Sequence, residues 1–202
     1  MPPPDPPLFT NSADLAGLIQ WSPAGKKIIA GMPPMEGPVF VQTLLDQKLY
    51  RDGNRAIPFL LSNRSACWWA SLCIWHSLEK KLAPAEQRTL DGCLRWILDP
   101  TLEHRRSASD LADSTASTAA VSCLGAAISV AVGGPSAKPR LAARLCTMAA
   151  VASYFATGRQ RQHREAYAII GAEILHGRGH WALPPAVASR SQLYRFAEKG
   201  SK

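Results

Sequence analysis

The sequence of 202 residues contains few groups that could build a metal centre or a disulfide framework. It has five cysteines, an odd number, and no two of them have the C-x-x-C spacing found in zinc sites and redox motifs. Each cysteine lies in an apolar run, which is typical of a buried free thiol. The sequence therefore predicts no disulfide and no bound metal, and it favours a reducing, cytoplasmic location.

Targeting and membrane segments are also sparse. The N-terminus, MPPPDPPLFT, has neither the basic region nor the apolar region of a secretory signal. The run from Ala116 to Val132 approaches the length of a membrane span, but it consists largely of Ala, Ser, Thr and Gly and lacks a belt of aromatic residues. Because small side chains let helices approach closely, we interpret this run as a central packing helix and expect no membrane span.

Motifs that would name a reaction are missing. The sequence AGKK (Ala24 to Lys27) lacks the glycine spacing and the following Ser or Thr of a phosphate-binding loop. No nucleophile elbow and no paired-carboxylate motif accompanies the serines, histidines and aspartates. The sequence thus predicts no catalytic residue and no cofactor.

Positive charge is concentrated in the second half of the chain. Residues 1–101 carry 10 Lys/Arg and 9 Asp/Glu, whereas residues 102–202 carry 13 Lys/Arg and 6 Asp/Glu. Such an imbalance indicates either an acidic partner or a solvated basic surface. The densest basic cluster, RQRQHR, and a nearby arginine supply the candidate partner-binding residues: Arg159, Arg161, His163, Arg164 and Arg178.

The periodicity of apolar residues predicts an all-α fold of antiparallel helical hairpins, packed as one multi-helix bundle around a Trp-rich central helix. We expect three parts. Residues 1–36 form a Pro-rich segment with one short helix, which starts at Asn11 or Ser12 and is followed by a turn-rich linker. Residues 37–180 form the helical core domain, and residues 181–202 form an irregular basic tail.

The tryptophan-rich stretch SACWWASLCIW allows two interpretations, a platform for stacking bases or the middle of the core. On a helix its apolar residues cover nearly every side, and no Arg or Lys is interleaved with them, as a stacking platform would require. We therefore predict that the helix is enclosed by its neighbours. The expected core residues are Trp68, Trp69, Leu72, Trp75 and Trp96.

Two later helices carry apolar stripes that we expect to face the core. One stripe contains Leu141, Leu145, Met148, Ala152 and Phe155, and the other contains Ala166, Tyr167, Ile170 and Ile174. The arginines between the two stripes would then project from the end of a hairpin. The sequence HGRGHW, which follows, could be a two-histidine metal site, but Gly177 or Gly179 is better explained as the residue that ends the helix.

The sequence VFVQTLLDQKLYRDGNRAIPFLLSNRSACWWASLCIW resembles an uncharacterised bacterial all-helical family with a CWWAxLC-type helix. TLDGCLRWILDP resembles its next helix, and the similarity covers about residues 27–178. Pro58 departs from the family pattern, which places the start of its helix in question. Members of that family have no established activity and occur among type VI secretion gene clusters, which implies an adaptor or effector-associated role.

Three functions follow as hypotheses. The first is a non-catalytic adaptor, chaperone-like or scaffolding subunit that binds another protein with an acidic surface, in a secretion-type assembly. The second is a nucleic-acid-binding module that uses the basic half of the chain, with Arg159, Arg161 and Arg164 on phosphates. The third is an enzyme of unrecognised class. The sequence names neither the partner nor the oligomeric state.

Overall fold

The computed structural model describes residues 6–78, 81–116, 119–131 and 138–178 of the chain. These residues form nine α-helices and a short 3₁₀ turn, and within them the single extended pairing is an isolated bridge between Asn11 and Glu36. The predicted all-α class is confirmed. The helices are α1 (Pro23–Gly31), α2 (Gly37–Asp46), α3 (Tyr50–Leu60), α4 (Asn63–Leu78), α5 (Pro84–Leu98), α6 (Leu102–Asp113), α7 (Ala120–Ala131), α8 (Pro139–Phe155) and α9 (Gln160–Leu175).

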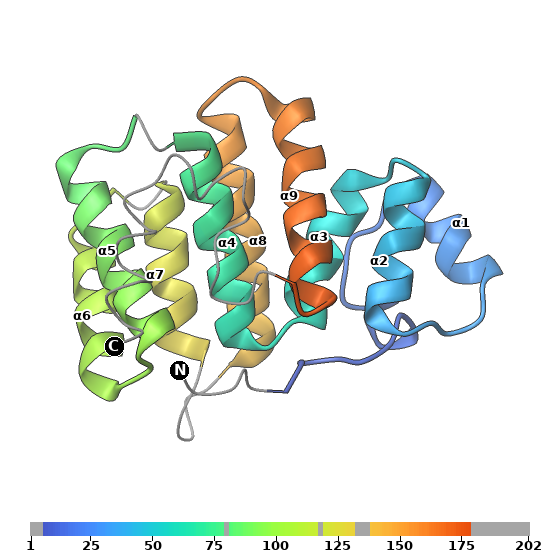
Figure 1. The fold of residues 1–202 in the computed structure, drawn as a ribbon, viewed down its shortest axis with the longest axis horizontal. Helices are drawn as coiled ribbons and strands as arrows, with labels where there is room; N and C mark the ends of the chain where they lie inside the picture. The colour runs from blue at the N-terminus through green and yellow to red at the C-terminus, as the bar shows by residue number, and fades with distance from the viewer. Residues whose placement is uncertain (1–5, 79–80, 117–118, 132–137, 179–202) are drawn as a thin grey trace.

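Helices α4 and α8 lie side by side at the centre of the bundle (Figure 1). Helices α5, α6 and α7 pack on one side of this pair, and α9 and α3 pack on the other, followed by α2 and α1 at the far end. Helix α4 contacts α3, α5, α7, α8 and α9, so neighbours surround it. Within the described ranges no helix is long and apolar enough to cross a membrane.

The tryptophans of α4 are buried, as the all-round apolar character of the helix predicts. Trp68, Trp69 and Trp75 are at most 4% exposed, and Trp96 of α5 is equally enclosed. The indole Nε1 of Trp69 donates a hydrogen bond of 2.9 Å to the backbone oxygen of Tyr167, which ties α4 to α9. Three buried indoles cannot form a stacking platform without unfolding the core, so the alternative interpretation of this stretch is excluded.

The N-terminal segment differs from its prediction in two ways. The expected helix near Asn11 is only a 3₁₀ turn, Ala13–Leu15, whose first backbone N–H groups donate to Asn11 Oδ1. The expected linker contains helix α1. Leu15 and Trp21 are buried in the same core as the later helices. The tail at residues 181–202 lies outside the described residues.

Helix α1 forms because a buried carboxylate holds its first turn. Asp52 of α3 is 1% exposed and accepts hydrogen bonds from the backbone N–H and the hydroxyl of Ser22, the N-cap residue of α1. Ser22 Oγ in turn accepts from Gly25 N, and a Cβ at Gly25 would stand 2.7 Å from Asp52 Oδ2. Pro23 occupies the first turn, where proline's missing N–H costs nothing. The linker interpretation failed because this anchor comes from a residue thirty positions away.

The start of the helix that contains Pro58 was left in question by the sequence; helix α3 begins at Tyr50, and Pro58 lies inside it. Proline cannot donate the hydrogen bond to the carbonyl four residues before it, so Pro58 leaves α3 one bond short near its C-terminal end. The start at Tyr50 places Arg51 and Arg55 one turn apart on the same helix.

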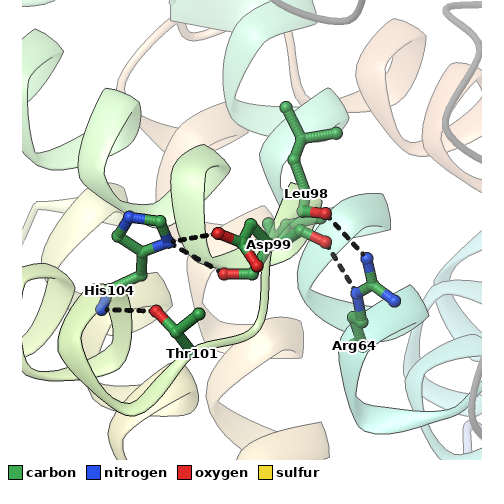
Figure 2. A network of polar contacts seen from close by, with 6 residues as sticks. Arg64, Leu98, Asp99, Thr101 and His104 are labelled. Carbon is green, nitrogen blue, oxygen red and sulfur yellow. Dashed lines mark hydrogen bonds and ion pairs between the residues drawn. The ribbon is translucent and has the colours of Figure 1, made fainter. Parts of the chain in front are cut away.

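Arg64 of α4 is buried and holds the end of α5 (Figure 2). Its Nε donates to Ile97 O at 2.6 Å and its Nη2 donates to Leu98 O at 3.2 Å, two carbonyls of the last helical turn. Figure 2 also shows His104 of α6, whose Nδ1 lies 2.9 Å from Asp99 O. Because helix ends leave carbonyls without intrahelical partners, we interpret this cluster as structural: it secures the α5–α6 corner.

Candidate partner-binding surface

The structure separates the five candidate residues of the basic cluster. Arg159 and Arg161 are exposed at the start of α9, whereas Arg164 is half-buried and points into a cleft. His163 lies against His76 of α4, with ring centroids 5.5 Å apart. Arg178 lies beyond the other end of α9 and forms an ion pair with Glu173 at 3.1 Å. The prediction that Arg164 projects outward with its neighbours was therefore wrong, and the five residues do not make one site.

Arg164 lines a cleft of about 290 Å³ between α3, α8 and α9. We call it the arginine cleft and define it by its lining residues. Two further arginines, Arg51 and Arg55 of α3, line it together with polar and apolar side chains of α3 and α8. Its other lining residues are Asn54, Thr147, Ala150, Val151, Tyr154 and Phe155.

Contacts with one another and with neighbouring residues hold the side chains of the cleft in place. The guanidinium carbon of Arg164 lies 5.2 Å from the ring centroid of Tyr154, and its Nη2 donates to Gln160 Oε1 at 3.2 Å. Arg55 donates from Nη1 to the backbone oxygen of Gln20. Asn54 Nδ2 donates to the backbone oxygen of Arg164 at 2.8 Å, which fixes α3 against α9. The cleft is thus built before any ligand arrives.

The arginine cleft concentrates uncompensated positive charge. In the described part of the chain, none of Arg51, Arg55 and Arg164 forms an ion pair with a carboxylate. Burial lowers the pKa of Arg55, and the positive charge of Arg51 lowers it further, partly offset by Asp52. Asp52 itself is held by Ser22. Like charges held this close repel one another, and a bound anion would relieve that repulsion.

Next to the cleft, α8 turns its large apolar side chains outward, contrary to the prediction. Leu141, Met148 and Phe155, spaced seven residues apart, are 40–55% exposed. The core-facing side of α8 consists of small residues and one tyrosine: Ala142, Ala143, Cys146, Ala149, Ala150, Ser153 and Tyr154. These small side chains let α8 pack closely against α4 and α7. The stripe on α9 behaves as predicted, since Tyr167, Ile170 and Ile174 are buried.

We call the outward stripe of Leu141, Leu145, Met148, Ala152 and Phe155 the α8 stripe; Leu145 and Ala152 within it are half-buried. Phe155 belongs both to the stripe and to the lining of the arginine cleft. Apolar and cationic groups therefore meet along one face of the molecule. Two more exposed arginines, Arg140 and Arg144, lie on α8 itself.

The other ionisable side chains that the structure describes do not converge from separate helices on one cleft as the three arginines do. His76 and His163 lie near Tyr167, whose hydroxyl is 2.7 Å from Ser153 Oγ, and burial lowers the pKa of both histidines. The sulfur atoms of Cys67 and Cys146 lie 3.7 Å apart. Their hydrogen bond, reinforced by burial, raises the pKa of the Cys67 thiol. The described residues contain no cluster of three or more His, Cys, Asp or Glu side chains that could hold a metal ion.

Helix α9 ends as the glycine-rich sequence HGRGHW predicts. Gly177 has φ +74°, the left-handed conformation that closes many helices and that favours glycine. Gly179, the other candidate for ending the helix, and His180, the second histidine of the alternative metal site, lie outside the described residues.

Arg51 and Arg55 were not among the residues singled out from the sequence. One signal was available: two arginines one turn apart on a helix repel each other by about 0.2–0.5 kcal/mol, a cost that a bound anion would offset. Tyr154 was not among those residues either, because nothing in its local sequence pattern indicates a role. Its position beside Arg164 depends on the packing of α8 against α9.

A model of the family of unknown function DUF6931 matches residues 40–175, more than half of the chain. The chain belongs to this family. The match spans α2 through α9, apart from the first residues of α2, and includes both the arginine cleft and the α8 stripe. No curated protein and no solved structure matches the chain. Membership in DUF6931 therefore brings no activity, ligand or partner with it.

Proposed function

We propose that this member of DUF6931 is a non-catalytic adaptor that binds an acidic, amphipathic segment of another protein along the α8 stripe. The observation that supports the proposal is the outward orientation of Leu141, Met148 and Phe155 beside unpaired arginines. Burying these side chains against a partner would be favourable by about 25 cal/mol per Å² of apolar area removed from water.

The spacing of the stripe matches a helical partner. When apolar side chains recur every seven residues on one helix, they can pack against a matching apolar stripe on a second helix. Amphipathic helices dock on apolar surfaces in this way. Scattered exposed apolar residues need no explanation, but a stripe along a whole helix rimmed by polar groups is typical of an interaction surface.

The charge around the stripe favours an acidic partner over a second copy of this chain. Arg140, Arg144 and the arginine cleft all border the stripe, and α8 carries no Asp or Glu. Two copies packed stripe to stripe would bring these arginines together without compensating charge. Carboxylates flanking the apolar side of a partner helix would instead pair with them and accelerate association.

An adaptor or scaffolding subunit of a bacterial secretion-type assembly, in the cytoplasm, is the role we propose for this binding. The resemblance to a family found among type VI secretion gene clusters motivates that setting. Nucleic acid is the less favoured ligand, because the tryptophans that could stack on bases are buried and the basic cluster of α9 is divided.

The test uses a synthetic helical peptide with leucines on one face and glutamates on the other, and a second peptide with lysine in place of glutamate. Fluorescence anisotropy should show that the parent protein binds the acidic peptide and not the basic one. The double substitution M148D/F155D should weaken binding at least about tenfold, since each buried anchor contributes about 1.5–3 kcal/mol.

The matched control is V39D, which places a carboxylate on an equally exposed apolar residue of α2, on the far side of α3 and α9 from α8. It should bind the peptide as the parent does. Equal loss in V39D and M148D/F155D would exclude the stripe as the surface. Binding of a DNA duplex in preference to both peptides, reduced steeply by salt, would favour the nucleic-acid hypothesis instead.

A further inference from the structure

We infer that the arginine cleft is a specific site for one phosphoryl group, a function that goes beyond the docking of a partner along the α8 stripe. The inference rests on what converges there. Arg51 and Arg55 from α3 and Arg164 from α9 line a single cleft, although α3 and α9 are more than a hundred residues apart in sequence.

The charge of the cleft matches a dianion better than a monoanion. Three guanidiniums without an ion-paired carboxylate in the described residues would be only partly neutralised by one carboxylate. A phosphoryl group carries about −1.5 to −2 charges at neutral pH and presents three strong acceptor oxygens. Guanidinium groups bind such oxygens in a fixed, often bidentate geometry, and the resulting hydrogen bonds are stronger than neutral ones.

Donors remain available after the internal contacts are counted. Among the described residues the guanidinium of Arg164 makes one hydrogen bond, from Nη2 to Gln160, and its buried Nε has no partner. Arg55 uses Nη1 to bind Gln20 O. A guanidinium has five N–H donors. The contacts to Tyr154, Gln160 and Gln20 orient the side chains but leave most donors for a ligand.

The size of the cleft limits what can enter. Sites for drug-sized ligands and cofactors span about 300–1,000 Å³, and the arginine cleft, at about 290 Å³, falls at the lower limit. A phosphoryl group with a short attachment fits this volume, whereas a whole nucleotide would have to extend outside. The apolar wall of Val151 and Phe155 would contact the carbon atoms next to the phosphate.

The experiment is isothermal titration calorimetry of the full-length protein with inorganic phosphate, and with acetate as the monoanionic comparison. Phosphate should bind measurably and acetate at least about tenfold more weakly. R51M should lower phosphate affinity about tenfold or more, because it removes a charge-assisted contact from an exposed residue on which the fold does not depend. R55M should do the same.

The matched control is R88M, which removes one exposed arginine from α5, outside the cleft. It lowers the net charge equally and should leave the affinity for phosphate unchanged. M148D should also retain phosphate binding. A protein that binds phosphate but not the acidic peptide would therefore contradict the proposed function alone, and the reverse result would contradict this inference alone.

Two further titrations identify the source of the phosphoryl group. One outcome is that glycerol phosphate and a short phosphoserine peptide bind equally well, with both affinities lost in R51M. In that case the cleft recognises the phosphoryl group alone, and the ligand is a small phosphate compound. A phosphoserine peptide that binds more than tenfold tighter than glycerol phosphate points to a phosphorylated protein. Absence of phosphate binding at millimolar concentration, equal binding of acetate, or equal losses in R51M and R88M would overturn the inference.

Discussion

Replacing Arg64 by methionine tests whether a buried cation secures the end of α5. The side chain is 2% exposed, and it donates hydrogen bonds to Ile97 O and Leu98 O (Figure 2). Methionine keeps an unbranched apolar stem of similar length but has no N–H donor. R64M therefore removes the hydrogen bonds and little of the packing.

The magnitude follows from the two carbonyls left without these donors. Each buried acceptor that loses its partner costs about 1–3 kcal/mol, so the two together cost about 2–6 kcal/mol. Burying methionine instead of a charged group returns about 1–2 kcal/mol of this. We expect a net loss of about 2–4 kcal/mol in the free energy of unfolding. In a chain of this size each kcal/mol lowers Tm by about 2–4 °C.

The assay is urea unfolding followed by tryptophan fluorescence, with the m-value compared between variants so that a change in midpoint reports stability. The control is R88M, the same substitution at an exposed position of α5, which should change stability by less than about 0.5 kcal/mol. A loss below about 1 kcal/mol in R64M, or the same loss in both variants, would refute the view that Arg64 secures the helix end.

Three more predictions concern the core and its ionisable groups. W69F should cost about 1–2 kcal/mol in the free energy of urea unfolding, through the lost hydrogen bond to Tyr167 O and a small cavity, and W69A about 3–5 kcal/mol. A loss below about 0.5 kcal/mol in W69F would show that the hydrogen bond contributes nothing. G125A should destabilise the fold, because its Cβ would overlap Ala112 Cβ and stand 3.0 Å from Ala108 O. G53A, whose Cβ would meet nothing nearer than 3.5 Å, should raise stability by up to about 1 kcal/mol. A change of Tm in the same direction in both variants would contradict this reasoning. Burial lowers the pKa of His76 and His163 below the ordinary value of 6.5, so the unfolded chain binds more protons than the folded one. The stability that the two neutral histidines contribute is complete above pH 6.5 and should fall as the pH is lowered through their folded-state pKa values. The double variant H76Q/H163Q should therefore lose less stability between neutral and mildly acidic pH, and an unchanged slope of stability against pH would exclude the pair.

Local patterns were sufficient to predict the helical class, the buried tryptophan helix and the ends of several helices. A helix that is apolar on every side, such as α4, is stable only when other helices surround it, and this holds whichever helices they are. Gly177 ends α9 in the left-handed conformation, and Pro38 lies in the first turn of α2, because both preferences belong to the residue itself.

Local patterns failed where a distant residue makes the decision. The segment that becomes α1 was taken for a linker, because its stabilising carboxylate, Asp52, belongs to another helix. The apolar stripe of α8 was expected to face the core, since large apolar side chains usually do. The structure places alanines there instead, because a close approach of α8 to α4 and α7 requires small side chains and leaves Met148 and Phe155 outside.

The arginine cleft shows the same division most clearly. The pattern of residues along the chain is sufficient to predict that α3 and α9 are helices and that each carries arginines, because composition and periodicity act within a helix. Whether Arg51, Arg55 and Arg164 share a cleft depends on how α3 and α9 pack against α8 and on the rotation of each helix about its axis. That rotation is set by the burial of side chains from the whole bundle, so the meeting of these three positive charges is a property of the folded protein and of no single helix.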